Sequence, residues 1–325
     1  MSLEALGWNS QWREMFEPHG SNGLLPARVV GEHRSHYTVA TGTTELPAGT
    51  TGRLRNSIEQ RSDLPGVGDF VGLRLSESGS PATIEVVLPR TSAVIRKASG
   101  KPEPQLLAAN VDVVFVVTAQ GGDFNMPRIQ RYLALVQQSG ALPVIVVNKS
   151  DLGNDVIRLI GQTEGFPTDV PVHAVGARAR DGLQVLERYF ENNRTVVLIG
   201  SSGVGKSTLT NKLLGRDVQA TQAIRDHDGR GRHTTTFRQL LVRPQGGAII
   251  DTPGLRGLEA WNADDACEGA FDDIEKLAPD CRFSDCGHNT EPGCAVLAAI
   301  AQGDLKAERL AEYNARASSK RRGAR

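Results

Sequence analysis

GSSGVGKS, residues 200–207, follows the apolar run Thr195–Ile199 and leads into a helical pattern. This is the spacing G-x-x-x-x-G-K-[ST] of a phosphate-binding loop in its required context, a strand before it and a helix after it. Its glycines let the backbone approach phosphate oxygens, and the helix directs its positive end at the same atoms. We therefore predict that Lys206 binds the β- and γ-phosphates of a nucleotide and that the Ser207 hydroxyl binds Mg²⁺. The residues expected to contact the nucleotide here are Gly200, Ser201, Ser202, Gly203, Val204, Gly205, Lys206, Ser207 and Thr208.

Strands and helices alternate around this loop. Apolar runs of strand length occur at 111–117, 144–147, 170–175 and 195–199. Helical patterns occur near 126–138, from 151 onward and at 181–190. Such alternation is typical of a doubly wound, mostly parallel sheet, so the predicted fold class is α/β. The runs 237–243 and 248–251, joined by Pro-Gln-Gly-Gly, predict a hairpin.

Asp251-Thr252-Pro253-Gly254 follows the second strand of that hairpin. An acid at the carboxyl end of a strand beside a phosphate loop is placed to hold Mg²⁺ through water, and the Gly254 N–H is placed to sense the γ-phosphate. Between the two motifs lies a loop, 225–236, that is rich in glycine, histidine and arginine. Its position predicts the first switch, with Thr235 completing the magnesium shell. The alternative is a plain surface loop.

A second polar tetrad, Asn148-Lys149-Ser150-Asp151, predicts the choice of base. Asp151 is suited to accept hydrogen bonds from the ring N–H and the exocyclic amine of guanine, and adenine lacks both donors in that arrangement. Asn148 is expected to brace the loop and Lys149 to cover the face of the base. The small-residue stretch 175–177 is expected to touch the base as well. The predicted ligands are therefore GTP and GDP with Mg²⁺.

The order of the motifs is unusual. The base motif at 148–151 precedes the phosphate loop at 200–207, which precedes the motif at 251–254. In most GTPases the phosphate loop comes first. The same sheet closes if the chain is circularly permuted, because new termini at a surface loop are tolerated.

The residue after the last motif is Leu255, where many GTPases place a glutamine that orients the attacking water. Leucine cannot bond water, so slow intrinsic turnover is expected. His233 in the predicted switch is the nearest motif residue able to position or activate water, and we predict it to be catalytic together with Thr235. The alternative is a switch histidine that contacts RNA or solvent.

Three cysteines and a histidine gather near the end of the chain, at Cys281, Cys286, His288 and Cys294. Three thiolates and one imidazole make a complete tetrahedral shell for Zn²⁺, and a shell with no open position is structural. One structural Zn²⁺ is therefore predicted. The alternative is a set of buried thiols beside an unrelated histidine.

The N-terminal quarter has a different pattern. Short apolar stretches between residues 24 and 90 predict a small barrel of the oligonucleotide-binding (OB) type. Trp8, Trp12 and Phe16 before it have helical spacing and are expected to pack against the body. Basic residues of the barrel suggest either an RNA-binding face or an ordinary solvated surface; they are Arg28, Arg34, Arg53, Arg55, Arg61, Arg74, His33 and His36.

The motif order, with GSSGVGKSTL, GRHTTT, DTPG and the cysteine pattern, resembles the ribosome small-subunit-dependent GTPase A family. That resemblance covers about 24–300 and implies a circularly permuted P-loop GTPase between an OB-type barrel and a helical zinc-binding domain. It also implies late maturation of the small ribosomal subunit, contact with rRNA, hydrolysis stimulated by the subunit, and a catalytic role for His233. The expected divisions are an arm at 1–23, the barrel at 24–90, the GTPase domain at 91–258 and the zinc domain with its basic tail at 259–325.

The composition of the chain limits the classes of protein and the locations that are expected. The 325 residues hold 37 Lys+Arg and 37 Asp+Glu, which excludes a uniformly basic nucleic-acid coat. The sequence has no signal-like apolar segment near its start, and none of its apolar runs is long enough to span a membrane. A cytoplasmic monomer without membrane contact is therefore expected. Two alternatives to the ribosome-stimulated enzyme stay open: a GTP-regulated RNA-binding module, and another ribosome- or tRNA-related GTPase with little intrinsic hydrolysis.

Overall fold

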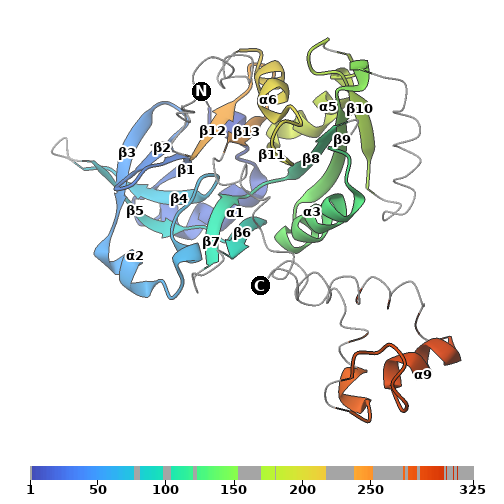
Figure 1. The fold of residues 1–325 in the computed structure, drawn as a ribbon. Coiled ribbons are helices and arrows are strands. Elements are labelled where there is room, and N and C mark those ends of the chain that lie inside the picture. The colour runs from blue at the N-terminus through green and yellow to red at the C-terminus, as the bar shows by residue number, and fades with distance from the viewer. Residues whose placement is uncertain are drawn as a thin grey trace, which may run out of the picture. The chain divides into compact units, whose positions relative to one another are not determined.

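One continuous β-sheet passes from the N-terminal barrel into the nucleotide-binding half of the protein (Figure 1). The chain divides into two units, Met1–Asn262 and Ala263–Arg325. The structure, a computed structural model, describes residues 2–76, 81–97, 104–119, 123–152, 170–179, 181–216, 238–251, 274, 277–283, 286–303, 305, 310 and 313.

Six strands form the nucleotide-binding half of the sheet: β8 (Val113–Ala119), β9 (Leu142–Asn148), β10 (Val172–Val175), β11 (Thr195–Ile199), β12 (Arg238–Val242) and β13 (Ala248–Asp251). Their spatial order is β10-β9-β8-β11-β13-β12. The first five are parallel, and β12 pairs antiparallel with β13. The predicted parallel sheet and hairpin are therefore confirmed.

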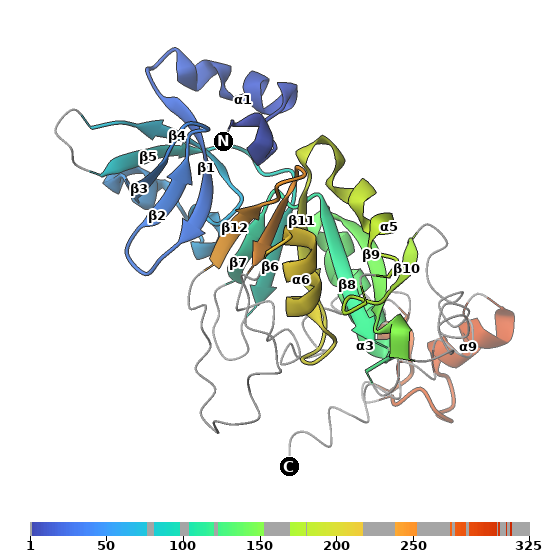
Figure 2. The ribbon, with the colours of Figure 1, turned by 90° about the horizontal axis from the view of Figure 1, so that it is seen from above.

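Helices cover both faces of this half-sheet because its strands alternate apolar side chains between the two sides (Figure 2). Residues of α3 (Met126–Ser139) pack with Val114 and Val116. Residues of α6 (Lys206–Leu214) pack with Phe115 and Val117 from the opposite face. The helix predicted at 181–190 is shorter, α5 (Gln184–Glu187) followed by the 3-10 helix η5 (Arg188–Asn193). Of the helix predicted from 151, only the 3-10 turn η3 (Ser150–Leu152) lies in the described part.

The predicted barrel is present. It consists of β1 (Leu25–Glu32), β2 (Tyr37–Ala40), β3 (Glu45–Thr50), β4 (Phe70–Arg74) and β5 (Ala82–Val87). The strands run in the order β1-β2-β3-β5-β4, and β4 pairs with β1 to close the ring. The helix α2 (Gly52–Ser57) and the 3-10 turn η2 (Arg61–Asp63) follow β3. The interior is filled by Ala27, Val29, Val39, Ala48, Val71, Leu73, Ala82 and Ile84.

Two strand pairs join the elements in ways that the sequence did not indicate. The end of β1 pairs antiparallel with the start of β12, Gly31 opposite Gln239 and Glu32 opposite Arg238, so the barrel and the larger sheet are continuous. A separate hairpin, β6 (Ala93–Lys97) with β7 (Pro104–Ala109), links the barrel to β8.

The N-terminal arm packs as predicted. It contains the 3-10 turn η1 (Glu4–Leu6) and α1 (Ser10–Gly20), whose N-cap is the Asn9 side chain. Trp8 and Trp12 lie against the Phe70 ring, with centroids 5.3 and 4.6 Å away. The aromatic cluster covers one end of the barrel and ties the arm to it.

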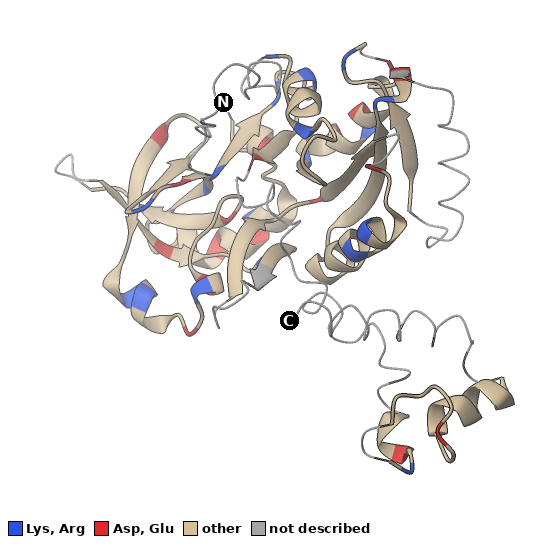
Figure 3. Cartoon of the chain, in the orientation of Figure 1, with Lys and Arg blue, Asp and Glu red and all other residues tan. Residues whose placement is uncertain are grey.

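The structure corrects one residue of the predicted basic face, Arg28. Its side chain is 1% exposed, because it lies between the arm, the barrel and the larger sheet. The guanidinium donates to Leu6 O, Gly68 O, Asn110 O and the Thr195 Oγ1. Arg74 is engaged as well, in an ion pair with Glu85. Acidic and basic residues are interspersed along the ribbon of the described part of the barrel (Figure 3).

The second unit contains the 3-10 turn η8 (Ala278–Asp280) and α9 (Ala295–Gln302), which begins directly after Cys294. Its small core includes Ile274, Cys294, Val296 and Leu305, and Cys281 and Cys286 pack against it. Across the residues described in both units, no helix has the length and apolar character needed to cross a membrane.

Candidate nucleotide site and metal centre

The phosphate loop lies at the carboxyl edge of the sheet, between β11 and α6, as predicted. Three of its glycines have positive φ: 145° at Gly200, 84° at Gly203 and 95° at Gly205. A Cβ at Gly200 would lie 2.1 Å from Val117 O, and a Cβ at Gly205 would lie 2.3 Å from the Asn148 Nδ2. Glycine is therefore required at both positions by the backbone and by close approach.

Lys206 and Ser207 begin α6, where the helix leaves backbone N–H groups pointing at the loop. The Lys206 ammonium donates to Gly200 O and Ser201 O, each at 2.5 Å. The lysine thus spans the loop and holds a positive charge over the position that phosphates take in such a nest.

Asn148 brings the base motif and the phosphate loop together. Its Nδ2 donates to Val204 O at 2.8 Å, and its Oδ1 accepts from the Ala177 N–H at 3.1 Å. The side chain is 2% exposed, so both bonds are buried. One amide therefore connects three segments that are far apart in the sequence, including the stretch 175–177 that was predicted to touch the base.

The remaining base-motif residues are placed by the turn after β9. Lys149 has a φ of 63°, which turns the chain sharply, and its ammonium lies 3.4 Å from an Asp123 carboxylate oxygen. Asp151 lies beside the loop at Gly176, where a Cβ would be 3.0 Å from the Asp151 Oδ1. Ser150 and Asp151 belong to η3. An acid at this edge, next to a small-residue loop, is suited to bond the polar edge of a planar base.

Asp251 is the last residue of β13, next to β11, and is 7% exposed. Its carboxylate and the Ser207 hydroxyl are at the ends of elements that meet at one edge, and hard oxygen ligands of this kind suit Mg²⁺. His233, Thr235 and Gly254 lie outside the described residues.

Sequence reasoning missed two residues beside the nucleotide site. The Arg128 guanidinium, from the first turn of α3, donates to the Ser201 hydroxyl in the phosphate loop. Asp123, just before α3, accepts from Lys149. Asn125 fixes the start of the helix by capping the Arg128 N–H at 2.9 Å. That cap was the only available signal, since no motif includes these positions.

The predicted zinc ligands come together. The ligand atoms of Cys281, Cys286, His288 and Cys294 all lie within 4.8 Å of one another. The Cys281 and Cys294 sulfurs are 3.8 Å apart, and the His288 Nδ1 is 3.3 Å from the Cys294 sulfur. Zinc–sulfur bonds of about 2.3 Å at tetrahedral angles place two sulfurs about 3.8 Å apart. The four residues therefore fit a tetrahedral zinc ion.

Glu291 is a further residue that the motif did not include. Its carboxylate accepts the backbone N–H groups of Gly287, Asn289 and Thr290. Backbone hydrogen bonds, its own first and then those of Asn289 and Gly287, lower the pKa of Glu291 to about 2. The ionised carboxylate thus fastens the loop that carries His288, which itself has a φ of 56°.

We expect chelation of zinc, with Mg²⁺ kept in excess, to unfold the second unit and to leave GTP affinity unchanged. A structural ion contributes folding free energy directly, whereas all the nucleotide motifs belong to the first unit. Limited proteolysis and nucleotide titration measure the two effects, and Cys286→Ser should reproduce them. Two results together would contradict this expectation: the purified protein contains no zinc, and chelation does not change its proteolysis pattern.

Comparison with known proteins agrees with this geometry. The profile of the RsgA GTPase family matches residues 87–261. "Small ribosomal subunit biogenesis GTPase RsgA" of Opitutus terrae is 43% identical over 96% of this chain and 88% of its own length. The protein of the same description from Streptomyces coelicolor is 43% identical over 96% and 85%.

Two crystal structures show the same fold. YjeQ from Thermotoga maritima matches with a TM-score of 0.57 and 29% identity, over 89% of this chain and 96% of that one. YloQ, described as a circularly permuted GTPase, matches with a TM-score of 0.55 and 23% identity, over 91% and 96%. The circular permutation inferred from motif order therefore holds, and the chain belongs to the RsgA GTPase family.

Proposed function

We propose that this protein is a GTP hydrolase that binds the small ribosomal subunit and assists its late maturation. The observation that carries nucleotide binding is the pair of buried bonds made by Asn148, which places the base motif beside the phosphate loop. Membership of the RsgA GTPase family supports hydrolysis. The names of the relatives, small ribosomal subunit biogenesis GTPases, support the partner.

The nucleotide-binding roles follow from position. Lys206 and the backbone of 200–205 bind the phosphates, Asp151 selects guanine, and Asn148 braces the two loops. When bound, Mg²⁺ neutralises charge on the β- and γ-phosphates; Ser207, Asp251 and Thr235 are the proposed residues around it. Gly254 follows Asp251 closely in the chain, and its N–H is the proposed sensor of the γ-phosphate.

Water activation is assigned to His233. We expect His233→Ala to lower subunit-stimulated hydrolysis by about 100-fold or more, the usual contribution of a positioned acid–base group, and to leave GTP affinity unchanged. Single-turnover hydrolysis with saturating subunits measures this, and His19→Ala in α1 is the matched control. Stimulated hydrolysis that stays normal in His233→Ala would remove the assignment.

The barrel and the zinc-bearing unit are proposed to contact the small subunit. The barrel contacts rRNA and the zinc-bearing unit supports docking, with one structural Zn²⁺ held by the four ligands described above. The protein acts as a cytoplasmic monomer. The divisions 1–23, 24–90, 91–258 and 259–325 are proposed as the arm, the barrel, the GTPase domain and the zinc domain.

A further inference from the structure

The strand β12 stands between the barrel and the acid proposed to bind Mg²⁺. Gln239 of β12 pairs with Gly31 of β1 on one side and with Asp251 of β13 on the other. Neighbouring strands are about 4.8 Å apart, so two strand spacings, about 10 Å, separate the barrel backbone from that of Asp251. The path from β1 to β13 through β12 consists of paired strands, so a displacement of β1 would also displace β12.

A partly buried side chain, that of Arg238, bridges the same junction. The Arg238 Nη1 donates to the Glu32 Oε2 at 2.7 Å and to Leu106 O at 2.8 Å. The Arg238 side chain is 14% exposed and that of Glu32 is 31% exposed, so the pair is partly shielded from solvent. Arg238 is the first residue of β12 and comes two positions after the predicted switch, 225–236. It therefore ties the chain leaving the switch to the barrel and to β7.

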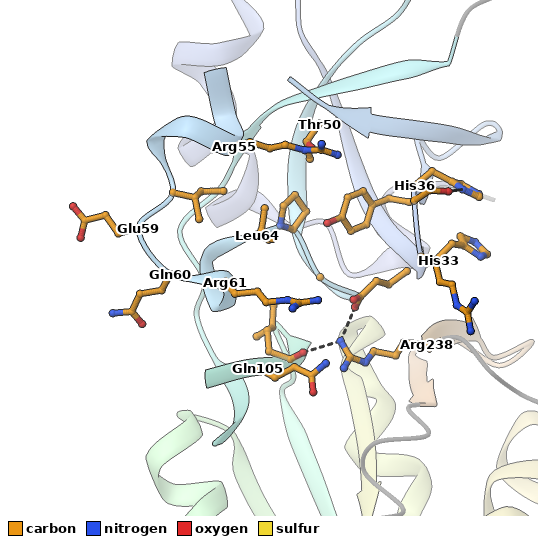
Figure 4. A pocket seen from close by; sticks show the side chains of 18 residues that line it. His33, His36, Thr50, Arg55, Glu59, Gln60, Arg61, Leu64, Gln105 and Arg238 are labelled. Atoms are coloured by element: carbon orange, nitrogen blue, oxygen red, sulfur yellow. Dashed lines mark hydrogen bonds and ion pairs between the residues drawn. The ribbon is translucent and has the colours of Figure 1, made fainter. Parts of the chain in front are cut away.

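This tie borders a cavity of about 970 Å³, which we call the junction pocket (Figure 4). Barrel residues on one side and Gln105 and Arg238 on the other line it. The guanidinium groups of Arg61 and Arg238 point toward one another in the pocket, and the Arg55 Nε donates to the Thr50 hydroxyl at its rim. Two glutamates, Glu32 and Glu59, also line the pocket, so its positive charge is only in excess. That excess suits phosphate groups of RNA, and a partner seated on the barrel would contact it close to Arg238.

We propose that Arg238 is a positioning residue that couples docking of the barrel on the small subunit to GTP hydrolysis. The inference rests on the proposed function. Arg238 and the two β1–β12 pairs hold β1 and β12 as one body, so a shift of the barrel on docking moves Gln239 and, through it, Asp251.

The test is a pair of changes that each remove one charge of the ion pair, Arg238→Gln and Glu32→Gln, in the full chain. Each is expected to leave GTP affinity and basal hydrolysis unchanged and to lower the ratio of subunit-stimulated to basal hydrolysis by about 5-fold or more, the usual lower range of coupling between sites. Arg74→Gln is the matched control, because it breaks another arginine–glutamate pair of the barrel, Arg74 with Glu85, away from β12. Its ratio should stay at the wild-type value.

A double-mutant cycle separates coupling from general damage. If the two side chains act through one tie, Arg238→Gln with Glu32→Gln should lower the ratio no further than either change alone, and Arg238→Lys should retain part of it. Wild-type ratios in both single variants, or losses that add, would overturn the inference. Wild-type protein that is not stimulated by subunits would instead overturn the proposed function.

Discussion

Asp151→Asn is expected to lower GTP affinity by about 100-fold or more and to create affinity for xanthosine triphosphate. The carboxylate accepts from two guanine donors, and hydrogen bonds to a charged group contribute about 1.5–3 kcal/mol each. An asparagine offers one acceptor and one donor, so an N–H group would face the guanine amine. Xanthine has a carbonyl in place of that amine and therefore matches the asparagine.

Titration with fluorescent GTP and xanthosine triphosphate analogues measures both affinities in one preparation. Asp63→Asn, an exposed acid in the barrel turn η2, controls for the loss of one negative charge. Retained preference for GTP in Asp151→Asn would show that guanine is recognised elsewhere. A variant that gains affinity for xanthosine triphosphate must be folded, so this gain distinguishes a change of base recognition from a loss of folding.

Arg28→Met is expected to destabilise the first unit by about 3–5 kcal/mol, the usual effect of breaking a buried charged network. Methionine fills much of the space but removes the Arg28 donor from Leu6 O and Asn110 O, and it leaves Gly68 O with the Asn110 Nδ2 as its remaining donor. Burial lowers the pKa of Arg28 to about 10, so the guanidinium is still charged at neutral pH. It also lies over the Phe70 ring, 4.7 Å from the centroid.

Urea unfolding followed by tryptophan fluorescence reports this change, because Trp8 and Trp12 pack in the affected cluster. Arg53→Met, an exposed arginine in α2, is the control for loss of charge and is expected to unfold close to the wild-type midpoint. Equal midpoints for Arg28→Met and wild type would mean that the arm and sheet are held without the buried guanidinium.

The outline of the fold and the nucleotide motifs followed from local patterns. Runs such as 113–117 are apolar on both faces, as a covered parallel strand requires, and the phosphate loop carries glycines where the backbone has positive φ. The cysteine cluster was also predictable, because its four ligands are close in the sequence. These features depend on neighbouring residues and are therefore visible in one chain.

Long-range pairs were not predictable. Arg28 looked like surface charge because nothing near it in the sequence reveals that Leu6, Asn110 and Thr195 surround it. The β1–β12 pairing joins residues about 200 positions apart and needs a register that no local pattern specifies. Arg128 likewise reaches Ser201 only through the packing of α3 on β8, the strand that pairs with β11.

The most direct test of the account is GTP turnover by the purified protein alone, with small ribosomal subunits and with large subunits. Turnover alone should be slow, about 10⁻⁴–10⁻² s⁻¹, because Leu255 cannot orient water. Small subunits should raise it many-fold, and large subunits should not. Equal turnover in all three samples would contradict the proposed function and favour a GTP-regulated binding module, and stimulation by large subunits alone would assign a different partner.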